Sequence, residues 1–224
     1  MPSEFSTEGS VADAEALAKN LGIAYETIPI RQSYDSMLAT LQPFFDSKPF
    51  DVTEENLQAR IRAMMLMAMC NKHHYILLNT SNKSEMAVGY GTLYGDMCGG
   101  ISVLGDVYKS EVYDLTRYIN RNGEIIPQNI ITKPPSAELR PGQKDSDSLP
   151  LYSILDQVLY SYIEERRGPK ELVAMGFDQS LVDRVLKMVN TNEHKRYQAP
   201  PALRVSRKAF GSGRRMPIVA KYLS

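Results

Sequence analysis

The stretch "YILLNTSNKSEMAVGYGTLYGDMCGG" (residues 75–100) decides the fold class, because an apolar run leads directly into a segment rich in Gly, Thr, Asn and Tyr. A short apolar run bounded by polar, turn-forming residues is typical of a buried strand. In open α/β sheets, ligands bind beyond the carboxyl ends of the strands. The change in composition after Leu78 therefore predicts a strand that delivers polar side chains to a ligand site.

Helical and strand patterns alternate on both sides of this stretch. We expect helices at 10–21, 34–45, 54–73, 108–120, roughly 149–165 and 178–192. Ser10 is the expected N-cap of the first of these helices, and Thr53 caps the third. Strands are expected at 23–30 and 74–80, and a strand or extended segment at 101–107. This order is typical of an α/β fold with a mainly parallel sheet and flanking helices. In the helix at 54–73, an apolar stripe is expected to pack in the core, as are the neighbouring methionines (Leu57, Ile61, Met64, Met65, Ala68; Met67, Met69).

Composition predicts one globular domain over residues 1–224, since 43% of the residues are hydrophobic and 23% charged. A formal net charge of zero argues against nucleic acid or a membrane surface as a partner. Residues 132–150, rich in Pro and Ser, are expected to form a loop or lid. The segment 195–224 is expected to be a solvated basic tail, since it holds eight Lys and Arg and no acidic residue.

The cellular location is predicted to be the cytoplasm. Only two cysteines occur, with no zinc-binding or disulfide pattern, which suits a reducing compartment. No apolar run has the length of a membrane span, and the N-terminal residues lack the basic and apolar parts of a signal peptide.

Two glycine-rich segments do not fit nucleotide-binding motifs. A dinucleotide fingerprint needs G-x-G-x-x-G, but Gly95 stands one place too late after Gly89 and Gly91. The segment "GSGRR" (211–215) lacks the Lys-Ser/Thr pair of a phosphate loop. The three histidines have no metal-ligand spacing and support no Ser-His-Asp arrangement.

The polar residues after the expected strand could form a phosphate site. Thr80 and Asn82 would lie at the strand end, and a short helix would begin near Lys83 with free N–H groups that attract anions. Glu85 could hold Mg²⁺, and Lys109 could contact phosphate. From spacing alone, a polar capped helix on the surface remains an equal alternative.

Long segments of the chain resemble NAD⁺ synthetases, in particular the synthetase domain of the glutamine-dependent type. The resemblance rests on "NTSNKSEMAVGYGTLYGDMCGGISVLGDVYKSEVYDL" (79–115), and on "EENLQARIRAMMLMAMCNK" (54–72), "KPPSAELRPGQKDSDSLPLYSILD" (133–156) and "NEHKRYQAPPALRVSRKAFG" (192–211). It implies an adenine-nucleotide hydrolase-like fold and a homodimer. It also implies that ATP and Mg²⁺ activate the nicotinate carboxylate of deamido-NAD⁺ as an adenylate, which ammonia attacks without an enzyme nucleophile.

The resemblance also implies roles for individual residues. Those expected at ATP are Thr80, Lys109 and Ser136. Those expected at deamido-NAD⁺ are Asn56, Arg60, Glu85, Asp96, His194 and Lys195, with Glu85 also the expected ligand of Mg²⁺.

The chain departs from the family pattern because it contains no SGGxDS phosphate loop and no Cys-Glu-Lys glutaminase machinery. We therefore expect a truncated synthetase domain that lacks the family's first strands and receives ammonia from a glutaminase domain outside this chain. A sheet without those strands would have an open edge and an uncovered apolar face, which predicts aggregation or dependence on dimer contacts. The alternative is a non-catalytic remnant that binds deamido-NAD⁺ or mediates dimerisation.

Overall fold

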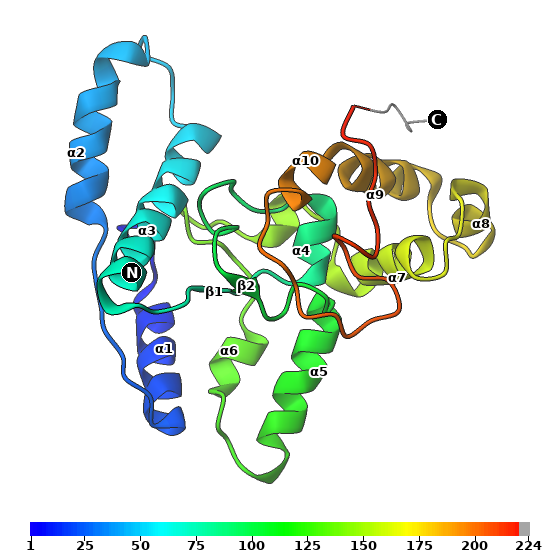
Figure 1. Cartoon of the computed structure of the whole chain (residues 1–224), viewed down its shortest axis with the longest axis horizontal. Helices are drawn as coiled ribbons and strands as arrows, with labels where there is room; N and C mark the ends of the chain where they lie inside the picture. The colour runs from blue at the N-terminus through cyan, green and yellow to red at the C-terminus, as the bar shows by residue number, and fades with distance from the viewer. Residues whose placement is uncertain (220–224) are drawn as a thin grey trace.

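A computed structural model describes residues 1–219, which form helices on either side of a small parallel sheet (Figure 1). Helices α1 to α3 lie on one side of the sheet, and α7 to α10 lie on the other. In chain order the elements are α1 (Glu8–Leu21), α2 (Arg31–Leu41), η1 (Gln42–Phe44), α3 (Val52–His73), β1 (Leu78–Asn79), α4 (Lys83–Val88), β2 (Ile101–Ser102), α5 (Lys109–Ile119), η2 (Asn120–Asn122), α6 (Gln128–Thr132), η3 (Asp145–Asp147), α7 (Tyr152–Ile163), α8 (Pro169–Ala174), α9 (Gln179–Thr191) and α10 (Glu193–Arg196). Among the described residues, no helix is long and apolar enough to cross a membrane.

The sheet is parallel, which confirms the predicted fold class. Leu78 lies opposite Ile101, and Asn79 lies opposite Ser102. On the other side of β2, Ala202 forms a parallel bridge with Ser102, so the C-terminal segment continues the sheet. Parallel pairing requires a crossover connection, and here α4 and the loop after it supply the crossover.

The main hydrophobic core lies between α4, α7, α8 and α9. Its fully buried side chains are Ala87, Leu155, Val158, Leu159, Leu172, Val182, Val185 and Val189. A smaller cluster of Ile30, Tyr34 and Ile61 joins α2 to α3. The two clusters leave the region between α3 and α5 free of tight packing, and the sheet ends there.

Two predicted N-caps are wrong, and α2 begins at Arg31 where residue 34 was expected. Helix α1 begins at Glu8, because the Thr7 hydroxyl accepts the N–H of Ser10 at 3.2 Å, so Thr7 rather than Ser10 is the N-cap. Helix α3 is capped by Asp51 rather than Thr53, in a capping box in which Glu54 accepts the Asp51 N–H. In both cases an oxygen-bearing residue slightly upstream satisfies the first free N–H groups.

The predicted strand at 23–30 is wrong. These residues have no regular secondary structure, because no strand among the described residues pairs with them and an isolated segment cannot form ladder hydrogen bonds. The Ile30 N–H instead donates to the carbonyl of Pro2 at 3.0 Å. The strand expected at 74–80 is limited to two residues for the same reason, because only Leu78 and Asn79 have a partner in β2.

The apolar stripe of α3 is only partly buried. Ile61 is 2% exposed in the smaller core cluster, with Leu57 and Met65 packed against it. Met64, in contrast, is 58% exposed, and Met67, Met69 and Ala68 are also exposed. The prediction that these methionines pack in the core is therefore wrong for this chain, because α2 covers only one side of the helix.

The segment 133–147 has little regular structure, but its middle is held against α1 and α3. The Glu138 carboxylate accepts hydrogen bonds from the hydroxyls of Thr7 and Ser10 at 3.0 and 2.6 Å. The amide nitrogen of Gln58, on α3, donates to the Leu139 carbonyl at 2.8 Å. Whether this loop acts as a lid stays a prediction, but the contacts fix it beside the end of the sheet.

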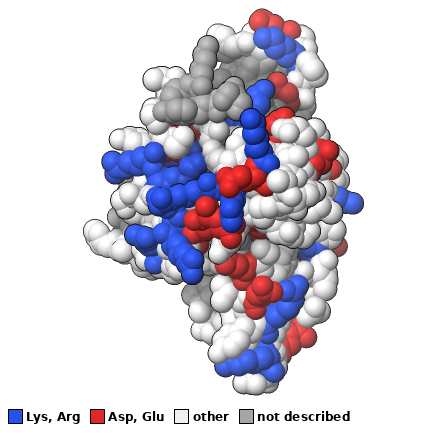
Figure 2. Space-filling model, turned by 90° about the vertical axis from the view of Figure 1, so that its right-hand side faces the viewer, with Lys and Arg blue, Asp and Glu red and all other residues white. Residues whose placement is uncertain are grey.

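The segment expected to be a solvated basic tail is packed against the body over residues 201–210. The Asp106 carboxylate accepts the N–H groups of Val205 and Ser206 at 2.8 and 2.7 Å, and Phe210 packs on the main core. Figure 2 shows the side of the molecule that is at the right in Figure 1. On that side, Lys and Arg lie beside Asp and Glu rather than in a field of one sign. Residues 220–224 of the expected tail lie outside the described residues.

Candidate functional site

A cavity of about 830 Å³ opens at the carboxyl end of β1, between α3, α4 and α5. The 89–98 loop and the 130–145 segment complete its walls. Seven of the nine predicted site residues line it, namely Asn56, Thr80, Glu85, Asp96, Lys109, Ser136 and Lys195. The sequence-based expectation that ligands bind beyond this strand therefore coincides with a cavity at the end of the sheet.

Glu85 and Lys109 form an ion pair across the cavity. The distance from Lys109 Nζ to Glu85 Oε1 is 3.6 Å, and both side chains are about one-fifth exposed, at 21% and 19%. Burial raises the pKa of Glu85 above its usual value, and the nearby ammonium of Lys109 partly opposes this shift. The same ammonium lies 5.5 Å from the centre of the Tyr152 ring, which limits its freedom.

Three N–H groups at the start of α4 already have acceptors within the protein. Asn82 and Glu85 form a capping box, in which the Asn82 side chain accepts the Glu85 N–H at 3.0 Å and Glu85 Oε2 accepts the Asn82 N–H at 3.2 Å. The Lys83 N–H donates to the Val107 carbonyl at 2.8 Å. These three donors have protein acceptors, and the anion site expected at this helix start stays a prediction.

The 89–98 loop is held in shape by its own polar side chains. Asp96 Oδ1 accepts the Thr92 N–H at 2.9 Å, and the Thr92 hydroxyl donates to Asn56 on α3 at 2.6 Å. Lys195 donates to the carbonyls of Gly89 and Gly91 at 2.7 and 2.8 Å. Burial lowers the pKa of Lys195, and Asp96 opposes this shift. Three predicted site residues therefore share one hydrogen-bonded loop.

Sequence reasoning missed Asp145, which is buried at the floor of the cavity. Its carboxylate accepts the hydroxyls of Tyr90 and Tyr152 at 3.2 and 2.9 Å, and its N–H donates to the Pro135 carbonyl at 3.0 Å. The backbone N–H of Asp145 thus closes the base of the 135–145 loop, whose Ser136 lines the cavity. No sequence signal marks Asp145, because it lies in a Pro- and Ser-rich segment that has the composition of an ordinary loop.

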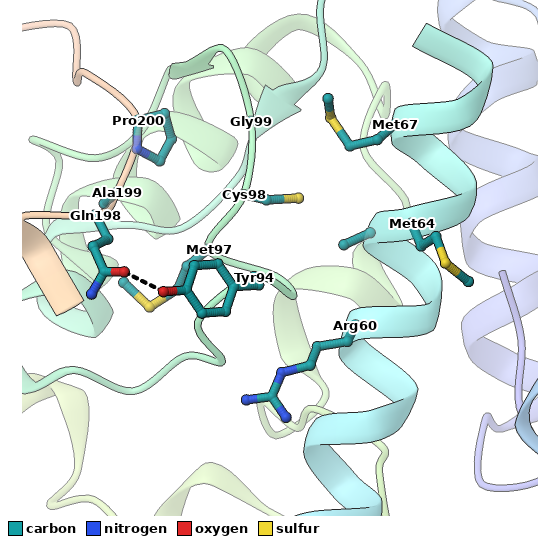
Figure 3. A pocket seen from close by; sticks show the side chains of 11 residues that line it. Arg60, Met64, Met67, Tyr94, Met97, Cys98, Gly99, Gln198, Ala199 and Pro200 are labelled. Atoms are coloured by element: carbon teal, nitrogen blue, oxygen red, sulfur yellow. Dashed lines mark hydrogen bonds between the residues drawn. The ribbon is translucent and has the colours of Figure 1, made fainter. Parts of the chain in front are cut away.

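Two predicted residues lie outside this cavity. Arg60 donates to the Leu93 carbonyl at 3.1 Å and lines a second pocket of about 440 Å³ on the other side of the 89–98 loop. Figure 3 shows that Met64 and Met67 of α3, together with Tyr94 of the loop, surround this pocket. His194 is exposed, and its Nδ1 is 3.1 Å from the Thr191 carbonyl.

A comparison with models of known protein families identifies the chain. Residues 1–199 match the model described as NAD synthase. The chain belongs to the NAD synthase family. The cavity therefore lies in a domain of this family, and it contains the residues that the resemblance had marked at ATP.

Curated relatives place the chain beside the glutamine-dependent members of the NAD synthase family. It is 50% identical over 222 residues to the glutamine-dependent NAD(+) synthetase of Synechocystis sp., covering 99% of this chain and 40% of that protein. It is 51% identical over 224 residues to the enzyme of the same name from Thermotoga maritima, covering 99% of this chain and 39% of that protein. The chain thus spans about 40% of the length of these relatives.

Solved structures of the family have the same fold. A glutamine-dependent NAD+ synthetase from Acinetobacter baumannii in complex with ADP is 42% identical, with a TM-score of 0.59, over 98% of this chain and 39% of that one. An NMN synthetase from Francisella tularensis is 30% identical, with a TM-score of 0.72, over 87% of this chain and 73% of that one.

Proposed function

We propose that the chain carries the synthetase site for ATP-dependent amidation of deamido-NAD⁺ to NAD⁺. In the first step, an oxygen of the nicotinate carboxylate attacks the α-phosphorus of ATP, and the bond to the pyrophosphate leaving group breaks. Ammonia then attacks the acyl carbon of the adenylate, loses a proton and expels AMP. The observation that carries the proposal is the cavity that unites Glu85 and Lys109 at the end of a parallel strand in a chain of the NAD synthase family.

Lys109, Thr80 and Ser136 are the residues proposed to bind ATP. The Lys109 ammonium is a point charge suited to phosphate oxygens, and the hydroxyls of Thr80 and Ser136 line the same cavity. The complex of the Acinetobacter baumannii relative with ADP supports an adenine nucleotide as ligand. Binding and orientation of the two substrates would supply most of the rate, since no enzyme nucleophile is needed.

Glu85 is the carboxylate proposed to contact the Mg²⁺ that accompanies ATP. Mg²⁺ at nucleotide sites is held by one or two carboxylates together with phosphate oxygens and water, so a single carboxylate is a sufficient protein contribution. Within residues 1–219, Glu85 Oε1 has Lys109 at 3.6 Å as its only charged or hydrogen-bonding partner, whereas both oxygens of Asp145 accept tyrosine hydroxyls. Bound to the nucleotide, the cation would neutralise charge on the departing pyrophosphate.

Asn56, Asp96 and Lys195 are proposed to contact deamido-NAD⁺ in the same cavity. Arg60 and His194 remain proposed contacts of this substrate, although they lie outside the cavity in the isolated chain. The ammonia is proposed to come from a glutaminase domain outside this chain, as the name of the glutamine-dependent relatives suggests.

A homodimer is also proposed, since α3 presents Met64 and Met67 to solvent beside Arg60. Apolar side chains concentrated on one surface are typical of protein interfaces. Light scattering coupled to size-exclusion chromatography would give the mass in solution. A dimer that dissociates in Met64→Lys but not in Met175→Lys, on another exposed methionine, would support the α3 face; a monomer at all concentrations would contradict it.

The proposed reaction is tested with the purified chain, MgATP, deamido-NAD⁺ and ammonium chloride. We expect calorimetric binding of both substrates and release of pyrophosphate that depends on deamido-NAD⁺. Glu85→Gln should lower the rate by orders of magnitude, whereas Glu165→Gln, an exposed residue of the α7–α8 connection, should not. Substrate binding without pyrophosphate release would instead identify a non-catalytic dinucleotide-binding module, and absence of binding would contradict both functions.

A further inference from the structure

Helix α5 caps its own N-terminus only in part, through the Glu111 carboxylate, which accepts the Tyr108 N–H at 2.8 Å. Its N-cap is Tyr108, whose side chain makes no capping hydrogen bond. The Lys109 N–H donates instead to the Ser84 hydroxyl of α4 at 2.9 Å. The Ser110 N–H and hydroxyl donate to Asp156 Oδ2 of α7 at 2.8 and 2.7 Å. The first N–H groups of α5 are therefore satisfied by two other helices.

Asp156 connects both of those helices. Its second oxygen, Oδ1, accepts the hydroxyl of Ser84 at 2.5 Å, so one carboxylate holds the residue that caps Lys109 and also caps Ser110 directly. Asp156 is 5% exposed and Ser84 is fully buried. Within residues 1–219, no Lys or Arg side chain forms an ion pair with Asp156. Its charge is therefore stabilised by these hydrogen bonds and by the positive end of α5.

The residues joined by Asp156 are the chain neighbours of the two charged groups in the cavity. Ser84 immediately precedes Glu85, and Ser110 immediately follows Lys109. Lys109 is the first residue of α5, so the orientation of its side chain depends on how the first turn of that helix is held. A change of about 1 Å in such a position is enough to cost a large factor in rate or affinity.

We propose that Asp156 is a positioning residue of the nucleotide site. It touches no ligand in this proposal; it fixes the first turn of α5 against α4, and thereby sets Lys109 opposite Glu85. The neighbouring Leu155 and Leu159 supply the packing of α7, so the carboxylate of Asp156 serves the joint between the helices rather than the core. The proposal rests on the proposed function for its ATP readout, but the position of Lys109 can be tested without any nucleotide.

Asp156→Asn is the informative variant, because it keeps the size of the side chain. An amide offers one acceptor oxygen in place of two, so it cannot serve the hydroxyl of Ser84 and both donors of Ser110 as the carboxylate does. Ser110→Ala removes one of these bonds and should give a smaller effect in the same direction. Asp183→Asn on α9 is a matched control, since that carboxylate is exposed and bonds only to Gln179 in the same helix.

The first measurement is the rate of acetylation of individual lysines in the ligand-free chain, read by mass spectrometry. We expect Asp156→Asn to raise the labelling rate of Lys109 by about threefold to tenfold, as loss of a charge-assisted hydrogen bond loosens the turn. Lys83, which is fully buried, reports on unfolding and should stay unlabelled. An unchanged rate at Lys109 in a folded Asp156→Asn variant would overturn the proposal.

The second measurement is the affinity for MgATP in a double-mutant cycle with Lys109→Met. We expect Asp156→Asn to weaken binding by about fivefold to tenfold in the wild-type background, and by less than about twofold in the Lys109→Met background. An equal loss in both backgrounds would mean a structural role that does not act through Lys109, and would overturn the proposal. If the wild-type chain binds no MgATP, the proposed function fails, and the labelling of Lys109 still decides the role of Asp156.

Discussion

Lys109 Nζ and Glu85 Oε1 lie 3.6 Å apart. Lys109 belongs to α5 and Glu85 to α4, and these helices begin 26 residues apart in the chain. The pair brings one positive and one negative side chain to the wall of the same cavity. Each member has a different partner in the proposed reaction, since the ammonium would face phosphate and the carboxylate would face Mg²⁺. The pair is therefore the part of the cavity whose alteration is most informative.

Glu85→Gln should change how stability depends on pH. Burial raises the pKa of Glu85, so above the unfolded value of about 4.3 the folded state binds the proton more tightly than the unfolded state. The free energy of unfolding of the wild type therefore falls as pH rises through the folded pKa, and glutamine removes this contribution. Urea unfolding between pH 4 and 8 should show the variant gaining stability relative to the wild type as pH rises. A parallel pair of pH profiles would contradict the expectation.

Lys109→Met should weaken the binding of MgATP by tenfold or more, on the order of 1.4 kcal/mol, because a charge-assisted contact to phosphate is lost. Isothermal titration with MgATP measures the change. The matched control is Lys170→Met on α8, where the lysine is exposed and far along the chain from the cavity residues. Equal affinities for wild type and Lys109→Met would exclude this lysine from the phosphate contacts.

Lys83→Met should destabilise the fold strongly. The Lys83 ammonium is fully buried, pairs with Asp106 at 2.8 Å and with Glu164, and donates to the Ser206 hydroxyl at 2.7 Å. Removing one member of a buried charge network leaves uncompensated carboxylates, at a cost of about 3–5 kcal/mol. Chemical denaturation gives the value, with Lys170→Met as the surface control. A loss below about 1 kcal/mol would show that Asp106 and Glu164 find other partners.

Gly89→Ala should lower the melting temperature for two independent reasons. Gly89 has φ +70°, which is unfavourable for a residue with a side chain, and an added Cβ would lie 2.3 Å from Cγ of Asn192. We expect a loss of about 1–3 kcal/mol. Adding Asn192→Gly should relieve the contact but not the backbone cost, so the double variant should recover only part of the loss. Full recovery would assign the effect to the contact alone.

The exposed apolar residues at 75–78, which lead into β1 and include its first residue, should cause self-association of the chain at high concentration. Tyr75, Ile76 and Leu78 are 65%, 74% and 55% exposed, and the two-residue strand β1 is too short to protect them. Ile76→Lys should lower the light scattering of concentrated samples, whereas Met175→Lys, at the exposed C-cap of α8, should have less effect. A sharp, reversible unfolding transition of a wild-type monomer would contradict this prediction.

The sequence was sufficient to predict the helices with strong local signals. Helix α5 starts one residue after its predicted start, and α9 occupies 179–191 where 178–192 was expected, because periodicity and caps are local properties. The prediction of a strand at 23–30 failed, because a strand depends on a neighbouring strand, and the local sequence does not encode whether one is present. The short helices α8 and α10 were also missed, since they have too few turns to establish a period.

The candidate site was predicted by resemblance and by the strand-end rule, but its detailed interactions were not. Seven predicted residues share one cavity, yet the use of Lys195 to hold the carbonyls of Gly89 and Gly91 depends on contacts between segments over 100 residues apart. The capping box at Glu85 was visible as Asn82 followed three residues later by an acidic residue. This sequence pattern predicts the start of a helix, but it does not reveal that the capping box also occupies one oxygen of the Glu85 carboxylate.

The partners of the buried Lys83 ammonium are synthesised at different times, and the last of them lies near the C-terminal end of the described residues. The ammonium donates to the Lys208 carbonyl at 3.0 Å, and that acceptor lies 125 residues later in the sequence. While a ribosome is still making the last helices, Asp106 and Glu164 are already available to pair with the lysine, but its acceptors at Ser206 and Lys208 are not. The hydrogen-bond set of this buried ammonium is therefore complete only once residues 201–210 have packed against α4.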